Sequence, residues 1–85
     1  MVKSEILILI PEGLHARAAN AFLNHIKGSK SKIIFKYKNQ EANARSMLSL
    51  LALHVRFNRK IMVEVTGDDE KEVMQKIEHF FSISC

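Results

Sequence analysis

The chain has 85 residues, of which 47% are hydrophobic and 26% are charged, and its formal net charge is +4 at pH 7. This composition predicts one globular domain over residues 1–85 and excludes a disordered chain. The longest apolar run, residues 6–10, is too short to span a bilayer, no secretion signal opens the chain, and the single cysteine, Cys85, cannot form an internal disulfide. We therefore expect a cytoplasmic protein without membrane insertion.

The spacing of apolar residues predicts a strand followed by a helix at the start of the chain. Residues 2–10 are β-branched and apolar, and Pro11 with Gly13 ends them, which indicates a strand. From Ala16 to Lys27 the apolar residues recur with helical period, and Gly28 follows as a C-terminal cap. The predicted buried face of this helix comprises Ala19, Phe22, Leu23 and Ile26.

Residues 33–38 alternate between two faces, which predicts a second strand with Phe35 and Tyr37 directed inward. Asn39 and Gln40 turn the chain into a short third strand over residues 41–44. Five lysines crowd this region: Lys27, Lys30, Lys32, Lys36 and Lys38. We interpret them as a solvated face. An acidic protein partner explains the charge as well, whereas a nucleic-acid surface is disfavoured because the aromatic residues point inward.

The second half of the chain is predicted to add a helix, a strand and a helix, without any internal repeat. "SMLSLLAL" predicts a short helix capped by Ser46, and residues 61–65 alternate as a fourth strand that Gly67 ends. Asp69 and Glu72 have the spacing of a capping box for a last helix. Its buried face is predicted to comprise Val73, Ile77, Phe80 and Phe81. Four strands and three helices favour one sheet with all helices on a single face, an α+β fold.

His15 is the candidate functional residue because of its position in "EGLHARAAN". It ends the strand-to-helix loop, so the free N–H groups of Ala16 and Arg17 point past it and form an anion site with the helix dipole. The Arg17 guanidinium adds a positive fork that can grip an oxyanion. An imidazole at such a site can accept a phosphoryl group, which suggests phosphoryl transfer.

The other histidines point to no further chemistry. His25 and His79 adjoin apolar helix positions and are interpreted as surface or boundary residues. Since no pair of histidines has metal-ligand spacing together with carboxylates or thiolates, we expect no metal and no cofactor.

Three stretches carry a resemblance to a known family. "GLHARAA", "NARSMLSLLAL" and "VEVTGDDEKEV" resemble the HPr family, the histidine-containing phosphocarriers of the bacterial phosphoenolpyruvate-dependent sugar phosphotransferase system. The resemblance implies an open-faced β-sandwich of order βαββαβα, a four-stranded antiparallel sheet covered by three helices. It also implies that the first strand pairs with the fourth and the fourth with the second.

The same resemblance implies the site and its partners. His15 would be phosphorylated on Nδ1 by phosphorylated enzyme I, Arg17 would stabilise the phosphate, and sugar-specific enzyme IIA domains would receive it. Such a carrier is a substrate of phosphotransferases and not itself an enzyme. The implied docking residues are Ala16, Arg17, Asn20, Asn24, Lys27, Met47, Leu48 and Leu51. Met47, Leu48 and Leu51 are equally consistent with the half-buried core of a short helix.

Ser46 has two interpretations. It is a helix N-cap, and it matches the serine that a dedicated kinase phosphorylates in Gram-positive members of the family, where it controls carbon catabolite repression. The resemblance thus adds a kinase/phosphorylase and a catabolite-control transcription factor as partners. The alternative function is a regulatory binding module of this kind with little role in sugar uptake.

The chain departs from the family at several positions. Ala18 stands where proline is usual, and Glu12 places a carboxylate near the site. Asn39, His54 and Asn58 stand where glycine is common, and we expect them to adopt positive φ, as Asn and His do most readily after glycine.

Some of the strand residues on the face of the sheet that carries no helices are predicted to be apolar. Alternation directs Leu7, Leu9, Ile34 and Met62 outward, and the family's strand order would bring them side by side. A contiguous cluster of this kind suggests self-association or a partner surface, including exchange of the first strand between protomers.

Overall fold

The computed structural model describes residues 1–82. Its elements, in chain order, are β1 (Val2–Ile8), α1 (Ala16–His25), β2 (Lys32–Tyr37), β3 (Gln40–Asn43), α2 (Met47–Ala52), β4 (Arg59–Thr66) and α3 (Glu70–Ser82). The strands form one antiparallel sheet in the order β1-β4-β2-β3. The βαββαβα order and the pairing of β4 with both β1 and β2 are therefore confirmed.

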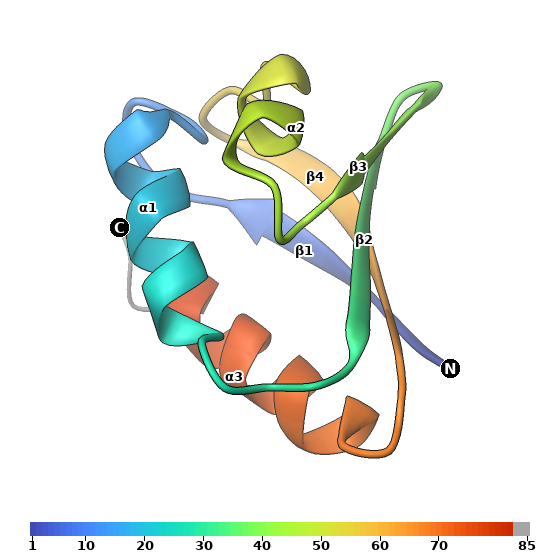
Figure 1. Cartoon of the computed structure of the whole chain (residues 1–85). Helices are drawn as coiled ribbons and strands as arrows, with labels where there is room; N and C mark the ends of the chain where they lie inside the picture. Colours follow the sequence, from blue (N-terminus) through green and yellow to red (C-terminus); the bar gives the residue numbers. More distant parts are fainter. Residues whose placement is uncertain (83–85) are drawn as a thin grey trace.

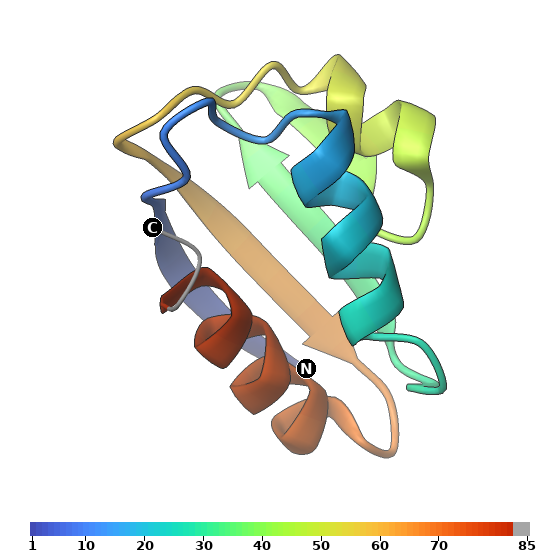
Figure 2. The same cartoon turned by 90° about the vertical axis from the view of Figure 1, so that its left-hand side faces the viewer.

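All three helices cover one face of the sheet (Figure 1). Figure 2 shows α1 and α3 lying in front of the sheet and α2 over its upper end. In both views the start of α1, the helix α2, the α2–β4 connection and the β2–β3 turn lie at the same end of the molecule. No helix of residues 1–82 covers the other face of the sheet, which we call the open face.

The core lies between the sheet and the helices. Phe22 of α1 is fully buried at its centre, with its ring 5.2 Å from that of Phe35 on β2 and 5.6 Å from that of Phe81 on α3. Burial of one such side chain contributes about 1.5–3 kcal/mol. Of the residues predicted to face inward from the strands, Tyr37 is only partly buried. The others are buried: Ile6, Ile8, Ile10, Ile33, Phe35, Ile61, Val63 and Val65.

Two predicted boundaries were too long. β1 ends at Ile8 rather than at residue 10, because the Asn58 N–H donates to the Ile8 carbonyl (2.7 Å) and the chain then turns. α1 ends at His25 rather than at Lys27, and Gly28 follows with φ +92°.

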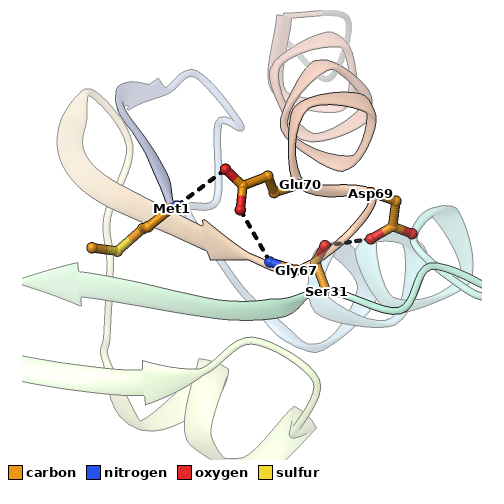
Figure 3. Close-up of polar contacts among 5 residues, drawn as sticks. All are labelled: Met1, Ser31, Gly67, Asp69 and Glu70. Carbon is orange, nitrogen blue, oxygen red and sulfur yellow. Dashed lines mark hydrogen bonds and ion pairs between the residues drawn. The ribbon is translucent and has the colours of Figure 1, made fainter.

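The predicted capping box of α3 is wrong. The Asp69 carboxylate does not cap with Glu72 but accepts from the Ser31 hydroxyl and from the Lys30 N–H (2.9 Å), which ties the start of α3 to the α1–β2 loop (Figure 3). Glu70 takes the capping role, since its carboxylate accepts from the Gly67 N–H (3.2 Å). The other oxygen of Glu70 lies 3.1 Å from the amino terminus of Met1.

Positive φ occurs at two of the three expected positions. His54 (φ 53°) and Asn58 (φ 67°) adopt it, as predicted. In the β2–β3 turn, however, Lys38 (φ 56°) and not Asn39 is in the left-handed region. The register explains this, because Tyr37 pairs with Gln40 and Lys38 is thus the first of two turn residues.

The apolar residues predicted side by side on the open face are not directly opposite one another, and Leu9 lies beyond the end of β1. The register sets Leu7 opposite Lys60, Met62 between Glu5 and Lys36, and Ile34 opposite Glu64, so the apolar residues are only diagonal neighbours. Ion pairs fill the positions between them: Lys3–Glu64 (3.7 Å), Lys36–Glu64 (2.9 Å), Lys36–Glu41 (3.5 Å) and Lys60–Glu5 (3.9 Å). Self-association through this face stays a prediction that such a charged surface does not favour.

The contact of Asp69 predicts a pH dependence of stability. The pKa of Asp69 lies below its ordinary value of 3.8, chiefly because the Ser31 hydroxyl donates to the carboxylate and also because the Lys30 N–H does. A carboxyl whose pKa is lowered by folding stabilises the folded state above its unfolded pKa, and this contribution is lost as the pH falls through the folded pKa. We therefore expect the free energy of unfolding to fall below about pH 4.

Urea unfolding at a series of pH values measures this effect. Asp69→Asn should flatten the dependence in the acid range, because the amide keeps an acceptor oxygen but does not ionise. Asp68→Asn, at the exposed neighbouring position, is the matched control. An acid-range slope in Asp69→Asn equal to that of the unchanged chain would contradict the assignment.

Candidate functional site

His15 is the N-cap of α1. Its backbone is extended (φ −103°, ψ −179°), and its half-buried ring turns back over the helix start, where Nδ1 accepts from the Arg17 N–H (3.2 Å). Because Nδ1 is the acceptor, its lone pair is unprotonated, and in the neutral ring the hydrogen is on Nε2. The ring nitrogen that carries no hydrogen is therefore the one that lies at the positive end of the helix.

The position of His15 is set by the residues before it. The Gly13 N–H donates to the Ile10 carbonyl (2.7 Å), and the Leu14 N–H donates to the Val55 carbonyl (2.9 Å). Gly13 has φ +76°, and a Cβ built on it would collide with the Val55 carbonyl oxygen. The β1–α1 loop is thus pressed against the α2–β4 loop, and buried Leu14 fixes the residue next to His15 in the core.

The predicted docking residues of α1 form one stripe. Arg17, Asn20, Asn24 and Lys27 are all exposed, and their spacing of three or four residues puts them on the same side of the helix. Lys27 lies beyond the last residue of α1, about 15 Å along the axis from the start of α1. Ala16, the first helical residue, is exposed beside His15.

The predicted docking residues of α2 divide into two kinds. Leu48 is 80% exposed, so its side chain is available for contact with a partner. Met47 and Leu51 are half-buried and pack against the core. One part of each side chain is therefore a core contact, and the other part remains accessible to a partner. Since α1 packs against α2, the two sets are brought to neighbouring helices.

Ser46 is the N-cap of α2, as predicted, and its hydroxyl accepts from the Ser49 N–H (3.3 Å). The side chain is half-buried, and its neighbours Met47 and Leu48 belong to the predicted docking residues.

Two residues near His15 escaped the functional interpretation of the sequence. His54 and Arg56, both exposed, line the same hollow as His15, together with Glu12 and Leu51. The sequence predicts a positive φ for His54 but assigns no function to its side chain. The stretch "HVRFNRK", residues 54–60, is rich in basic residues and could have drawn attention to His54 and Arg56. That this stretch lies close to His15, however, follows only from the hydrogen bond between Leu14 and Val55.

The remaining histidines are accounted for by structure. His25 is half-buried, and its Nε2 lies 2.9 Å from the Lys76 carbonyl, which joins α1 to α3. His79 is exposed on α3. Within residues 1–82, no group of three or more His, Cys, Asp or Glu side chains could hold a metal ion. No helix in this part of the chain is long and apolar enough to cross a membrane.

The chain resembles known phosphocarriers over nearly its whole length. The family model described as "PTS HPr component phosphorylation site" matches residues 2–82. The phosphocarrier protein HPr of Chlamydia muridarum is 33% identical over 76 residues, which are 89% of this chain and 73% of that one. The HPr-like protein Crh of Bacillus subtilis is 26% identical over 91% of both chains. The crystal structure of an HPr from Thermoanaerobacter tengcongensis superposes with a TM-score of 0.93 at 27% identity, covering 99% of this chain and 94% of that one.

The contact of Gly13 with the α2–β4 loop predicts a specific defect. Gly13→Ala should lower the free energy of unfolding by about 2 kcal/mol or more, because it adds a collision to the strain of a positive φ. Gly28→Ala is the matched control, since Gly28 also has positive φ but has open space around it. The control should lose only about 1 kcal/mol. Urea unfolding compares the two, and equal losses would show that the close approach costs nothing.

Proposed function

Because this chain belongs to the HPr family of phosphocarrier proteins, we propose that it accepts a phosphoryl group on His15 from phosphorylated enzyme I and passes it to sugar-specific enzyme IIA domains. The observation that carries the proposal is the hydrogen bond from the Arg17 N–H to Nδ1 of His15 (3.2 Å). In this role the chain is a substrate of phosphotransferases and returns to its starting state after each transfer.

The local geometry supports a direct transfer to Nδ1. The lone pair of Nδ1 attacks phosphorus, and the N–P bond forms as the bond between phosphorus and the donor group breaks. The Arg17 N–H then loses its imidazole acceptor, and it can donate to a phosphoryl oxygen instead. The exposed Arg17 guanidinium, which lines a hollow with His15, supplies the balancing charge.

The helix start thus serves both states of the carrier. Without phosphate, the ring nitrogen satisfies one amide of the first turn; with phosphate, an anion takes its place at the positive end of the helix dipole. The surface that we propose for docking comprises Arg17, Asn20 and Asn24 on α1, Lys27 just beyond the end of α1, and Leu48 on α2. A polar stripe beside an exposed leucine suits a carrier that binds several partners in turn.

His15 should be the only site of acid-labile phosphate. Incubation with phosphoenolpyruvate and enzyme I, followed by mass mapping, should find one phosphate on His15 and none in His15→Ala. His15→Asn is the better-matched variant, because asparagine keeps an N-cap acceptor and cannot accept phosphate on a ring nitrogen. Label that persists in either variant, or that maps to His25, His54 or His79, would overturn the proposal. Arg17→Ala should slow the transfer about tenfold, because the amide donors remain.

We also propose that Ser46 is the acid-stable site of a regulatory ATP-dependent kinase, with a catabolite-control transcription factor as a further partner. The position at the start of α2, next to Met47 and exposed Leu48, supports this. A dianion there is favoured by the helix dipole but adds negative charge to the docking surface. One phosphate on Ser46 should therefore slow the enzyme I reaction.

Treatment with a kinase/phosphorylase of the Gram-positive kind tests this second proposal. Ser46→Ala should take up no phosphate. Its free energy of unfolding should fall by about 1 kcal/mol, because the variant lacks the N-cap of α2. Ser49→Ala, one turn later in the same helix, should be phosphorylated normally. A phosphate mapped to Ser49, Thr66 or Ser82 would contradict the assignment.

The alternative is a regulatory binding module with little role in sugar uptake. The similarity to the HPr-like protein Crh is the observation that favours it. The two assays together separate the two functions: uptake of phosphate on Ser46 from ATP and the kinase, with none on His15 from phosphoenolpyruvate and enzyme I, would favour the module.

A further inference from the structure

A cleft of about 610 Å³ opens beside the site, between the β2–β3 turn and the α2–β4 connection. Figures 1 and 2 show both segments at the end of the molecule where α1 begins. The lining of the cleft includes Tyr37 and Lys38 from the turn and the end of β2, His54 and Arg56 from the connection, and Arg59 from the start of β4. We call this the basic cleft.

The charges of the basic cleft are unbalanced. Among residues 1–82, the cleft is lined by the basic side chains of Lys38, Arg56 and Arg59 and by no carboxylate. None of the three forms an ion pair within this part of the chain. On the open face of the sheet, by contrast, Lys3, Lys36 and Lys60 each pair with a glutamate. Convergent cations repel one another, and a bound anion would relieve the repulsion.

The backbone of the basic cleft is strained. The non-glycine residues with positive φ within residues 1–82 are Lys38, His54 and Asn58, and all three belong to the two segments that form the cleft. L-residues adopt this conformation at a cost, and glycine would adopt it freely. Strain of this kind gathers at functional sites, and at Lys38 and His54 the strained residue also contributes a cleft-lining side chain.

We propose that the basic cleft binds a small anion that carries two or more linked phosphate groups. The volume is within the range of small-molecule sites. Arg56 and Arg59 each present a planar fork that can hold one phosphate group in two hydrogen bonds, and Lys38 supplies a third charge from the β2–β3 turn. Two linked phosphate groups offer one group to each fork, whereas one isolated phosphate must share its few oxygens among all three basic side chains.

The basic cleft is distinct from the surface around His15 but adjoins it. His54 and Arg56 line both the cleft and the hollow that contains His15, whereas Lys38 and Arg59 line only the cleft. Binding is expected of the unphosphorylated chain, so the proposal does not depend on phosphoryl transfer to His15.

Calorimetric titration of the full chain with pyrophosphate, paired with NMR mapping of the perturbed amides, tests the proposal. Pyrophosphate should bind saturably, with orthophosphate at least about tenfold weaker. The largest shifts should fall on residues 37–40 and 53–59. Arg56→Gln and Arg59→Gln should each weaken binding about fivefold or more, since each removes charge-assisted hydrogen bonds.

Two further variants separate a built site from general charge. Lys60→Gln removes the same charge one residue along β4, on the opposite face of the sheet, and should leave the affinity unchanged. Lys38→Asn puts a residue that tolerates the left-handed region in the turn. It should weaken pyrophosphate binding without lowering the midpoint of thermal unfolding.

Four outcomes would overturn the proposal. One is the absence of saturable binding, and another is an equal loss in Lys60→Gln and Arg59→Gln. A third is a loss in Arg17→Gln with none in Arg56→Gln and Arg59→Gln, which would locate the anion at the start of α1. The fourth is tighter binding of a glutamate-rich peptide than of pyrophosphate, which would assign the cleft to an acidic protein partner.

Discussion

The close approach of Gly13 to Val55 is the contact on which the site depends. It presses the loop before α1 against the loop after α2, and the Leu14–Val55 hydrogen bond fastens the two backbones together. His15 follows directly and therefore starts α1 at a fixed place relative to α2 and β4. Both the arrangement of the docking helices and the hollow shared by His15, His54 and Arg56 follow from this one junction.

The second organising feature is the way in which charge is distributed. The open face of the sheet carries lysines and glutamates in register, so that the pKa of Glu64 is lowered and that of Lys36 is raised, in each case mainly by the hydrogen bond between them. At the end of the sheet that carries His15, the cations Lys38, Arg56 and Arg59 are left without carboxylate partners in the described part of the chain. Basic side chains without an ion-pair partner therefore lie beside the phosphoryl-transfer site that we propose, although the Glu12 carboxylate lines the same hollow as His15.

The regular elements could be predicted because their signals are local. Apolar residues recur with period two in the strands and with period 3.6 in the helices, and Ser46 caps α2 through a hydroxyl three residues from its donor. The candidate site was predictable for the same reason: His15, Ala16 and Arg17 are neighbours in sequence, and a loop that leads into a helix defines their geometry.

The sequence by itself thus determined the elements, the buried faces and the identity of the residue at the start of α1. Only the tertiary structure decided the strand register, which places charged residues between the apolar residues of the open face. It further decided that the Asp69 carboxylate accepts hydrogen bonds from Ser31 and Lys30 instead of forming a capping box, and that Lys38 has a positive φ. It also decided that His54 and Arg56 lie beside His15. Each of these depends on which distant segments meet, and such pairings are set by the packing of the whole core, because no local pattern of residues encodes them.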